Sequence, residues 1–143
     1  MELKKPGSTE SGSYYLWKDI DNVSSSWGNK WSTPTISEFD ELINYCSHTW
    51  TTKNGVNGYL FTGSNGATMF LPAVGFKAYI EGYGYSDVQS GGSTVLCWTN
   101  ELSSSSWEGQ NFAFVLEGNS TSLHTNTNYN ITTIAVPIRP ISR

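Results

Sequence analysis

Carboxylates and histidines are the side chains of this sequence that most directly suggest catalysis. Glu101, Glu108 and Glu117 lie near one another in the chain, and two carboxyl groups flanking the scissile bond are the machinery of most glycoside hydrolases. His48 and His124 are of the type that acts as a general acid or base. No nucleophile-elbow or zinc-protease motif surrounds either histidine. The sequence therefore predicts no enzyme, and these residues are interpreted as structural or solvated.

The glycine-rich stretch GVNGYLFTGSNGATMFLPAVG, at residues 55–75, raises the question of a phosphate-binding loop. A P-loop places Lys and Ser or Thr directly after its last glycine, at the start of a helix. Here Gly66 is followed by Ala67 and then by residues that favour a strand. The dinucleotide-binding fingerprint also requires a strand-to-helix turn. Residues 63–66 instead supply the positive φ angles of a tight turn, so the stretch predicts a β-hairpin over residues 58–72.

Metal and cysteine chemistry are weakly indicated. Asp19 and Asp21 offer two carboxylates to a cation such as calcium, although an ordinary loop entry is the favoured interpretation. Cys46 and Cys97 either form a disulfide or remain as two buried thiols. Of these alternatives, the sequence slightly favours the two buried thiols. Their spacing does not support a zinc site, and no cofactor is predicted.

Composition limits the possible partners. The chain has 143 residues, which suits one domain, and a net charge of -4, which provides no broad basic surface for nucleic acid. Charged residues make up only 14% of the chain and aromatic residues another 14%. A surface rich in uncharged polar and aromatic side chains suits an extracellular or cell-surface protein. No apolar run approaches the roughly 18 residues of a membrane span, and the sequence is compatible with a domain excised from a longer precursor.

One helix and several strands must position these residues. Thr35 and Glu38 form a capping box. The apolar residues that follow are spaced to share one helical face, namely Phe39, Leu42, Ile43 and Cys46, so a helix is predicted over residues 36–46. Strands are predicted at residues 94–100 and 111–118 and, as an irregular closing strand, at 134–141. Residues 14–20 are expected to form a strand or a structured edge. Residues 21–34 and 74–93 are expected to be mainly loop, 119–133 is a polar stretch, and 1–13 is expected to be a flexible entry segment.

Several of these segments, in this order, resemble a bacterial domain family. They are TPTISEF (33–39), CSHTW (46–50), GVNGY (55–59), TGSNG (62–66), MFLPAVG (69–75), LCWTN (96–100) and IRPI (138–141). The pattern is similar to that of the Fibrobacter succinogenes major paralogous domains, which are frequent in surface proteins of Bacteroidetes-type bacteria. The resemblance covers roughly residues 14–143. LCWTN departs from the family's aromatic-Trp-Ser-Ser strand, and Pro137 precedes the closing motif, so the local strand geometry at both places is open.

The resemblance implies an α+β, C-type-lectin-like fold with small twisted antiparallel sheets and one or two helices, forming a single domain over residues 14–143. The calcium-binding motifs of sugar-binding C-type lectins do not occur in this chain. Related formylglycine-generating enzymes need reactive cysteines, but the apolar neighbours of Cys97 are expected to raise its pKa. Arg139 is interpreted as a structural residue of the closing strand.

The resembling fold also places its ligand face in the C-terminal part of the domain. Residues 98–130 are the richest in aromatic and amide side chains, the types that dominate binding energetics. Trp98 has an alternative role in the core. The expected ligand-binding residues are Trp98, Asn100, Trp107, Asn111, Asn126, Asn128 and Tyr129.

Three functions remain open from the sequence. The first is a non-catalytic, surface-exposed ligand-binding or adhesion module whose partner is a protein or glycan of a cell surface. The second is the variable protein of a diversity-generating retroelement, in which a C-terminal segment of this composition carries a hypervariable binding site. The third is a structural module of a larger surface protein, with no ligand of its own.

Overall fold

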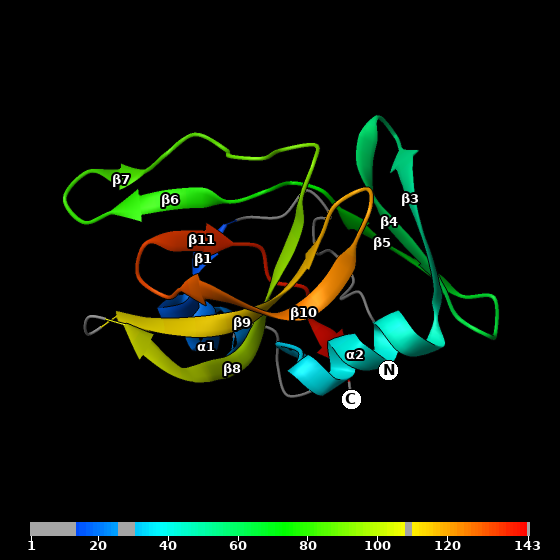
Figure 1. The fold of residues 1–143 in the computed structure, drawn as a ribbon, viewed down its shortest axis with the longest axis horizontal. Coiled ribbons are helices and arrows are strands. Elements are labelled where there is room, and N and C mark those ends of the chain that lie inside the picture. The colour runs from blue at the N-terminus through cyan, green and yellow to red at the C-terminus, as the bar shows by residue number, and fades with distance from the viewer. Residues whose placement is uncertain (1–13, 26–30, 108–109, 143) are drawn as a thin grey trace.

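The computed structural model of the chain describes residues 14–25, 31–107 and 110–142, and at residues 22, 24, 104–107, 126 and 142 it describes the backbone alone. The segment 1–13, expected to be flexible, lies outside the described residues. The described part is an α+β fold of mostly antiparallel sheets (Figure 1). Its helical elements are η1 (Trp17–Asp19), α1 (Ile20–Ser25) and α2 (Ile36–Tyr45).

In the described residues, twelve strands form four sheets. One sheet has the strand order β3 (Ser47–Lys53), β4 (Val56–Thr62), β5 (Thr68–Pro72). A second has the order β10 (Leu123–Asn130), β9 (Gln110–Gly118), β8 (Val95–Trp107). A third has the order β1 (Tyr15–Leu16), β11 (Ile134–Val136), β6 (Lys77–Ile80), β7 (Gly84–Tyr85), and the last sheet pairs β12 (Ile141–Ser142) with β2 (Trp31–Ser32).

The predicted helix is confirmed as α2. The Thr35 side chain accepts a hydrogen bond from the Glu38 backbone at 3.1 Å, and the Glu38 carboxylate accepts one from the Thr35 backbone at 2.9 Å. This capping box satisfies two of the backbone donors that an isolated helix start leaves unpaired. Phe39 and Leu42 are buried, and Cys46 at the end of the helix packs against the same cluster. The helix is thus fixed both by its own cap and by its apolar face.

The predicted hairpin is confirmed as β4–β5, and a second hairpin precedes it. In β4–β5 the turn is closed by Gly63 and Ala67, whose backbone groups are 2.8 Å apart. Strand β3 was not predicted, although the signal is in the sequence. Asn54 and Gly55 both have positive φ, of 53° and 81°, which is the pattern of an Asn-Gly turn between twisted strands.

The sheet of β8, β9 and β10 is central to the domain. Both β8 and β9 were predicted and extend beyond the predicted bounds. β10 forms from the polar stretch 119–133, which was given no secondary structure from sequence. It is held by antiparallel pairing to β9, with a register shift between His124 and Thr127. The apolar pattern of β10 is too weak to specify a strand, and the backbone hydrogen bonds to the buried strand β9 order it instead.

The segments expected to be loops contain short elements. Residues 74–93 include the short strands β6 and β7 and are otherwise mainly loop, as expected. Residues 21–34 include most of α1 and all of β2, so the expectation of loop was wrong there. The predicted edge at 14–20 is β1 followed by η1 and the start of α1. Ile20 is buried, and the Trp17 indole donates a hydrogen bond to the Thr99 carbonyl at 2.9 Å. Long-range contacts of this kind, with no local pattern, order the segment.

Two apolar clusters form the core, one on each side of the central sheet. Cys97 and Leu116 belong to the cluster under α2, whereas Trp98 and Val115 belong to the cluster that also contains Val136. Neighbouring residues of one strand contribute to opposite clusters because successive side chains point to opposite faces. The central sheet is therefore buried on both faces over this part of its length. No helix among the described residues is long and apolar enough to cross a membrane.

The closing segment is irregular, as predicted. β11 and β12 are separated by residues 137–140, which contain Pro137 and Pro140. β11 pairs with β1 and β6, and β12 pairs with β2. Arg139 is buried in this segment, in keeping with a structural role. The last two strands thus pair with the first two described strands of the chain.

Candidate binding pocket

Trp98, the first of the sequence-predicted ligand residues, is part of the core. Its side chain has 0% of its surface exposed, and its indole donates a hydrogen bond to the Tyr15 carbonyl at 2.7 Å. The prediction that Trp98 contacts a ligand is therefore wrong. The alternating direction of side chains along β8 directs Trp98 to the interior, while its aromatic type alone is equally suited to a core and to a binding surface.

Asn128 and Tyr129 are brought to different faces of the central sheet. Asn128 is exposed opposite Phe114, whereas Tyr129 lies opposite Ala113 and packs edge-on against Phe76, with ring centroids 6.3 Å apart. The Tyr129 hydroxyl donates a hydrogen bond to the Glu117 carboxylate. Burial, followed by the bond to and the charge of Glu117, raises the pKa of Tyr129 well above its usual range. Tyr129 is thus a neutral donor anchored inside the sheet.

The remaining predicted residues lie on the strands of the central sheet. Asn100 and Asn111 are exposed on β8 and β9. The side chains of Trp107 and Asn126 lie outside the described part of the structure. Among the described members, Trp98 is buried, Tyr129 is half-buried, and three asparagines are exposed. Apart from Trp98, the ligand-binding role of these residues stays a prediction.

The residues considered for catalysis make structural contacts. A Glu101 carboxylate oxygen accepts a hydrogen bond from the Ile36 backbone at 2.7 Å, at the start of α2, where the helix dipole favours a negative charge. His124 and Glu117 face each other across β10 and β9, with Nε2 and Oε1 3.3 Å apart. His48 lies on β3, beyond the helix end, with its ring 5.8 Å from the ring of Tyr59. Glu108 lies outside the described residues.

No metal site emerges from the described residues. Asp19 ends η1 and Asp21 lies in α1. Within residues 14–25, 31–107 and 110–142, no group of three or more His, Cys, Asp and Glu side chains is placed to hold a metal ion.

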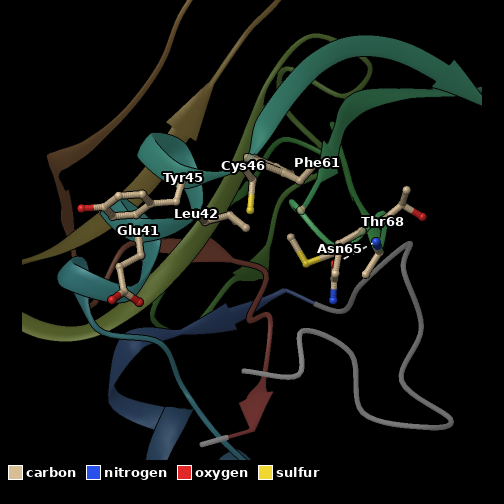
Figure 2. A pocket seen from close by; sticks show the side chains of 10 residues that line it. Glu41, Leu42, Tyr45, Cys46, Phe61, Asn65 and Thr68 are labelled. Carbon is tan, nitrogen blue, oxygen red and sulfur yellow. Dashed lines mark hydrogen bonds between the residues drawn. The ribbon is translucent and has the colours of Figure 1, made fainter.

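A pocket between α2 and the β4–β5 hairpin is the best-formed candidate site (Figure 2). Its volume is about 330 Å³, at the lower end of the range of small-molecule sites. Apolar side chains supply much of its wall, namely Leu42, Cys46, Phe61 and Met69. Figure 2 shows the helix on one side of the hollow and Asn65 and Thr68 on the other.

The two elements place this wall by simple geometry. Leu42 and Cys46 are four residues apart at the C-terminal end of α2, so they lie on the same side of the helix. Phe61 and Met69 are directly paired across β4 and β5 and therefore share one face of the hairpin. The turn beneath them is fixed because the Asn65 side chain accepts a hydrogen bond from the Ala67 backbone at 3.0 Å. The pocket is thus built on rigid elements and a braced turn.

Polar side chains also line the pocket. They are contributed by Glu41, Tyr45, Asn65 and Thr68. Tyr45 has 80% of its surface exposed, and in Figure 2 its hydroxyl points away from Asn65 and Thr68. Glu41 is the one ionisable carboxylate in the lining. An apolar wall with a few convergent polar groups is the usual form of a small-molecule site.

The two cysteines differ in environment. Both are free thiols; Cys97 is fully buried and Cys46 is partly exposed in the pocket wall. The expectation of two thiols is confirmed, while burial holds for Cys97 alone. Burial raises the pKa of Cys97 to about 12, with Arg139 acting weakly in the opposite direction. Cys46 is therefore the accessible thiol of this pair.

The buried thiol predicts a loss of stability at alkaline pH. The pKa of Cys97 is higher in the folded chain than its usual value of 9.0, so its contribution is fully present below about pH 9 and is lost as pH rises towards about 12. Between about pH 8 and pH 10 the free energy of unfolding is expected to fall by about 1–1.5 kcal/mol from this group. Urea unfolding at several pH values measures it. In Cys97→Val this fall in the free energy of unfolding between about pH 8 and pH 10 should disappear, whereas in Cys46→Ala it should remain as in the parent. If Cys97→Val loses stability with pH as steeply as the parent does, the Cys97 thiol is not its cause.

The sequence did not reveal this pocket because its residues were interpreted as core. The helix face and the hairpin were both predicted, but no local pattern indicates that the two would be separated by a hollow. The available signal was the small and polar turn, residues 63–67, beside large apolar residues. Comparisons of the chain with protein-family models, with curated proteins and with solved structures found no match.

Proposed function

We propose that this chain is a non-catalytic ligand-binding module, and that its ligand is a small uncharged molecule with an apolar ring or branched aliphatic group. The observation that carries this proposal is the pocket between α2 and β4–β5. Apolar side chains form much of its lining, and hydroxyl, amide and carboxylate side chains line it as well. Filling it would remove apolar surface from water at roughly 25 cal/mol for each Å² covered.

Charge and rigidity support the ligand class. A single carboxylate in the lining disfavours an anion, and the apolar wall gives no partner to a buried charge. The wall belongs to a capped helix and a paired hairpin, so little ordering is required on binding, which limits the entropic cost. The carboxylates Glu101 and Glu117 are engaged in structural contacts elsewhere, which favours binding over turnover.

We further propose that the fold is C-type-lectin-like and that the module acts at a cell surface. Support for the fold comes from the antiparallel sheets with α2 packed against them, from the confirmed hairpin and from the resemblance of the motifs. Support for the location comes from the composition, which has few charges and many aromatic and uncharged polar residues. A purely structural module without a ligand is the alternative that the following experiment separates.

Binding is tested by nuclear magnetic resonance with a defined panel of small probes, indole, phenol, cyclohexanol and benzamide. At least one probe is expected to shift the backbone amide signals of Leu42, Cys46 and Met69 in a saturable manner. Ala67→Leu places a larger side chain at the pocket lining and should weaken binding by about tenfold, which corresponds to about 1.4 kcal/mol.

Ser64→Leu is the matched control, since Ser64 is exposed in the same turn and does not line the pocket. It should leave the affinity unchanged within about twofold. If no probe shifts these signals, or if both variants weaken binding equally, the pocket is not the binding site. The structural module without a ligand then becomes the better proposal.

A further inference from the structure

An exposed tyrosine-rich hairpin lies at the other end of the domain. β6 and β7 form a two-residue ladder, in which Tyr79 pairs with Tyr85 and Ile80 pairs with Gly84. Tyr83 at the turn has 89% of its surface exposed, Ile80 has 61% and Tyr85 has 50%. In Figure 1 this hairpin projects at the left, away from α2 and β4–β5 at the right. It is thus spatially separate from the pocket described above.

The hairpin holds its side chains in fixed positions. The Tyr83 backbone donates a hydrogen bond to the Ile80 carbonyl at 2.9 Å. The Ser86 backbone donates to the Ala78 carbonyl at 2.8 Å, and the Ser86 side chain accepts from the Ala78 backbone at 3.0 Å. The rings of Tyr79 and Tyr85 lie 4.9 Å apart at 54° to each other. Exposed apolar groups that lie together, beside polar residues, mark an interaction site more often than scattered single residues do.

A second pocket adjoins this hairpin. Its volume is about 310 Å³, and its lining combines Tyr79 and Ile80 with the polar residues Lys18, Glu81, Thr132 and Thr133. The threonine turn is ordered by a side chain of the preceding strand. The Asn130 side-chain oxygen accepts hydrogen bonds from the backbones of Thr132 and Thr133, at 2.8 and 3.1 Å. Residues with hydroxyl, carboxylate and ammonium groups therefore line the same hollow as an aromatic residue.

We propose that this hairpin and its adjoining pocket bind a neutral saccharide. A sugar ring has an apolar face of C–H groups, which packs against an aromatic ring, and a rim of hydroxyls, which both donate and accept hydrogen bonds. Tyr79 and Ile80 supply the apolar contact. Thr132, Thr133 and Glu81 offer oxygen acceptors and Lys18 offers a donor. The lining thus matches both chemical features of such a ligand.

Charge distinguishes this ligand from the main alternatives. The lining contains one cation, Lys18, and one anion, Glu81, so the charges balance and neither an anionic nor a cationic ligand is favoured. A nucleic acid or an anionic membrane surface would require clustered basic residues. The high share of polar lining groups disfavours a purely hydrocarbon ligand, because their hydrogen bonds with water would be lost without replacement. This site goes beyond the proposed small-molecule pocket and does not depend on it.

The proposal is tested with five neutral oligosaccharides, maltotriose, cellotriose, xylotriose, mannotriose and chitotriose. Titration into the isotope-labelled protein should produce saturable shifts of the backbone amide signals of Ile80, Glu81, Thr132 and Thr133 for at least one sugar. Thr133→Val keeps the shape of the side chain and removes its hydroxyl, and Tyr83→Ala removes the most exposed ring. Each is expected to weaken binding by about tenfold or to abolish it.

Tyr45→Ala is the control, since Tyr45 is similarly exposed but lines the other pocket. It should leave saccharide affinity unchanged, and circular dichroism should show that all three variants remain folded. The proposal is overturned if no sugar shifts the hairpin signals, or if Thr133→Val and Tyr83→Ala bind as the parent does. Tyr83-dependent binding to phosphatidylcholine vesicles without binding to any of the sugars would equally overturn it and would assign the hairpin to membrane contact.

Discussion

Trp98→Ala is expected to lower the free energy of unfolding by about 3–5 kcal/mol. The side chain is fully buried in the cluster that contains Ala113, Val115 and Val136, so truncation leaves a large cavity on one side of the central sheet. It also removes the indole donor and leaves the Tyr15 carbonyl without this partner. A loss of this size is a large fraction of the total stability of a typical domain.

Chemical denaturation followed by circular dichroism measures this loss without relying on tryptophan fluorescence. Trp98→Phe keeps a ring and removes the N–H group, so it should cost less than Trp98→Ala. Tyr83→Ala, at an exposed position, should change stability by no more than about 0.5 kcal/mol. If Trp98→Ala costs less than about 1 kcal/mol, the indole is not part of the core and the ligand role predicted from sequence is restored.

Gly75→Ala is the second substitution with a large expected effect, about 3 kcal/mol or more. Gly75 has a φ of +66°, and a Cβ atom at this position would lie 1.9 Å from the Gln89 carbonyl oxygen. The oxygen belongs to the backbone and cannot move without disturbing the paired Phe76 and Gln89. Substitution is therefore expected to separate residues 89–94 from the end of β5.

Gly82→Ala separates the clash from the backbone strain. Gly82 has a similar φ of +86°, but a Cβ atom there would meet nothing within 4 Å. Its substitution should cost only the strain of a left-handed alanine, about 1–2 kcal/mol. Thermal and urea unfolding of the two variants gives the difference directly. Equal losses would mean that the backbone at residues 89–91 yields to the added methyl group.

The elements with complete local signals were predicted from the sequence. For α2, the capping residues Thr35 and Glu38 and the spacing of Phe39 and Leu42 agree with one another, so local preference and burial select the same structure. The β4–β5 hairpin likewise has a glycine-containing turn between two strand-forming runs. β10 has no such agreement, since its polar residues gain order only through pairing with β9. Its order depends on pairing with the strand directly before it in the chain, and not on a strand pattern of its own residues.

The candidate site was harder to predict than the fold. Assigning residues 119–133 no strand removed the alternation that sends Asn128 and Tyr129 to opposite faces, and so a single ligand face appeared possible. Aromatic type did not distinguish Trp98 in the core from Tyr83 on the surface. The two pockets each join segments that are distant in the chain, such as Lys18 and Thr132, and only the folded backbone brings them together.

The pairing of the last strands with the first also determines when the domain can form during synthesis. β1 waits for β11, and β2 waits for β12, so two of the four sheets remain incomplete until residues 134–142 have left the ribosome. The α2 and β3–β5 segment, by contrast, contains its own local pairings and can begin to form earlier. Closing loops of more than a hundred residues is entropically costly and slows folding. The nascent chain therefore exposes the apolar surface of Trp98 and Val115 until residues 134–142 emerge, and the pairing of these residues protects that surface from aggregation.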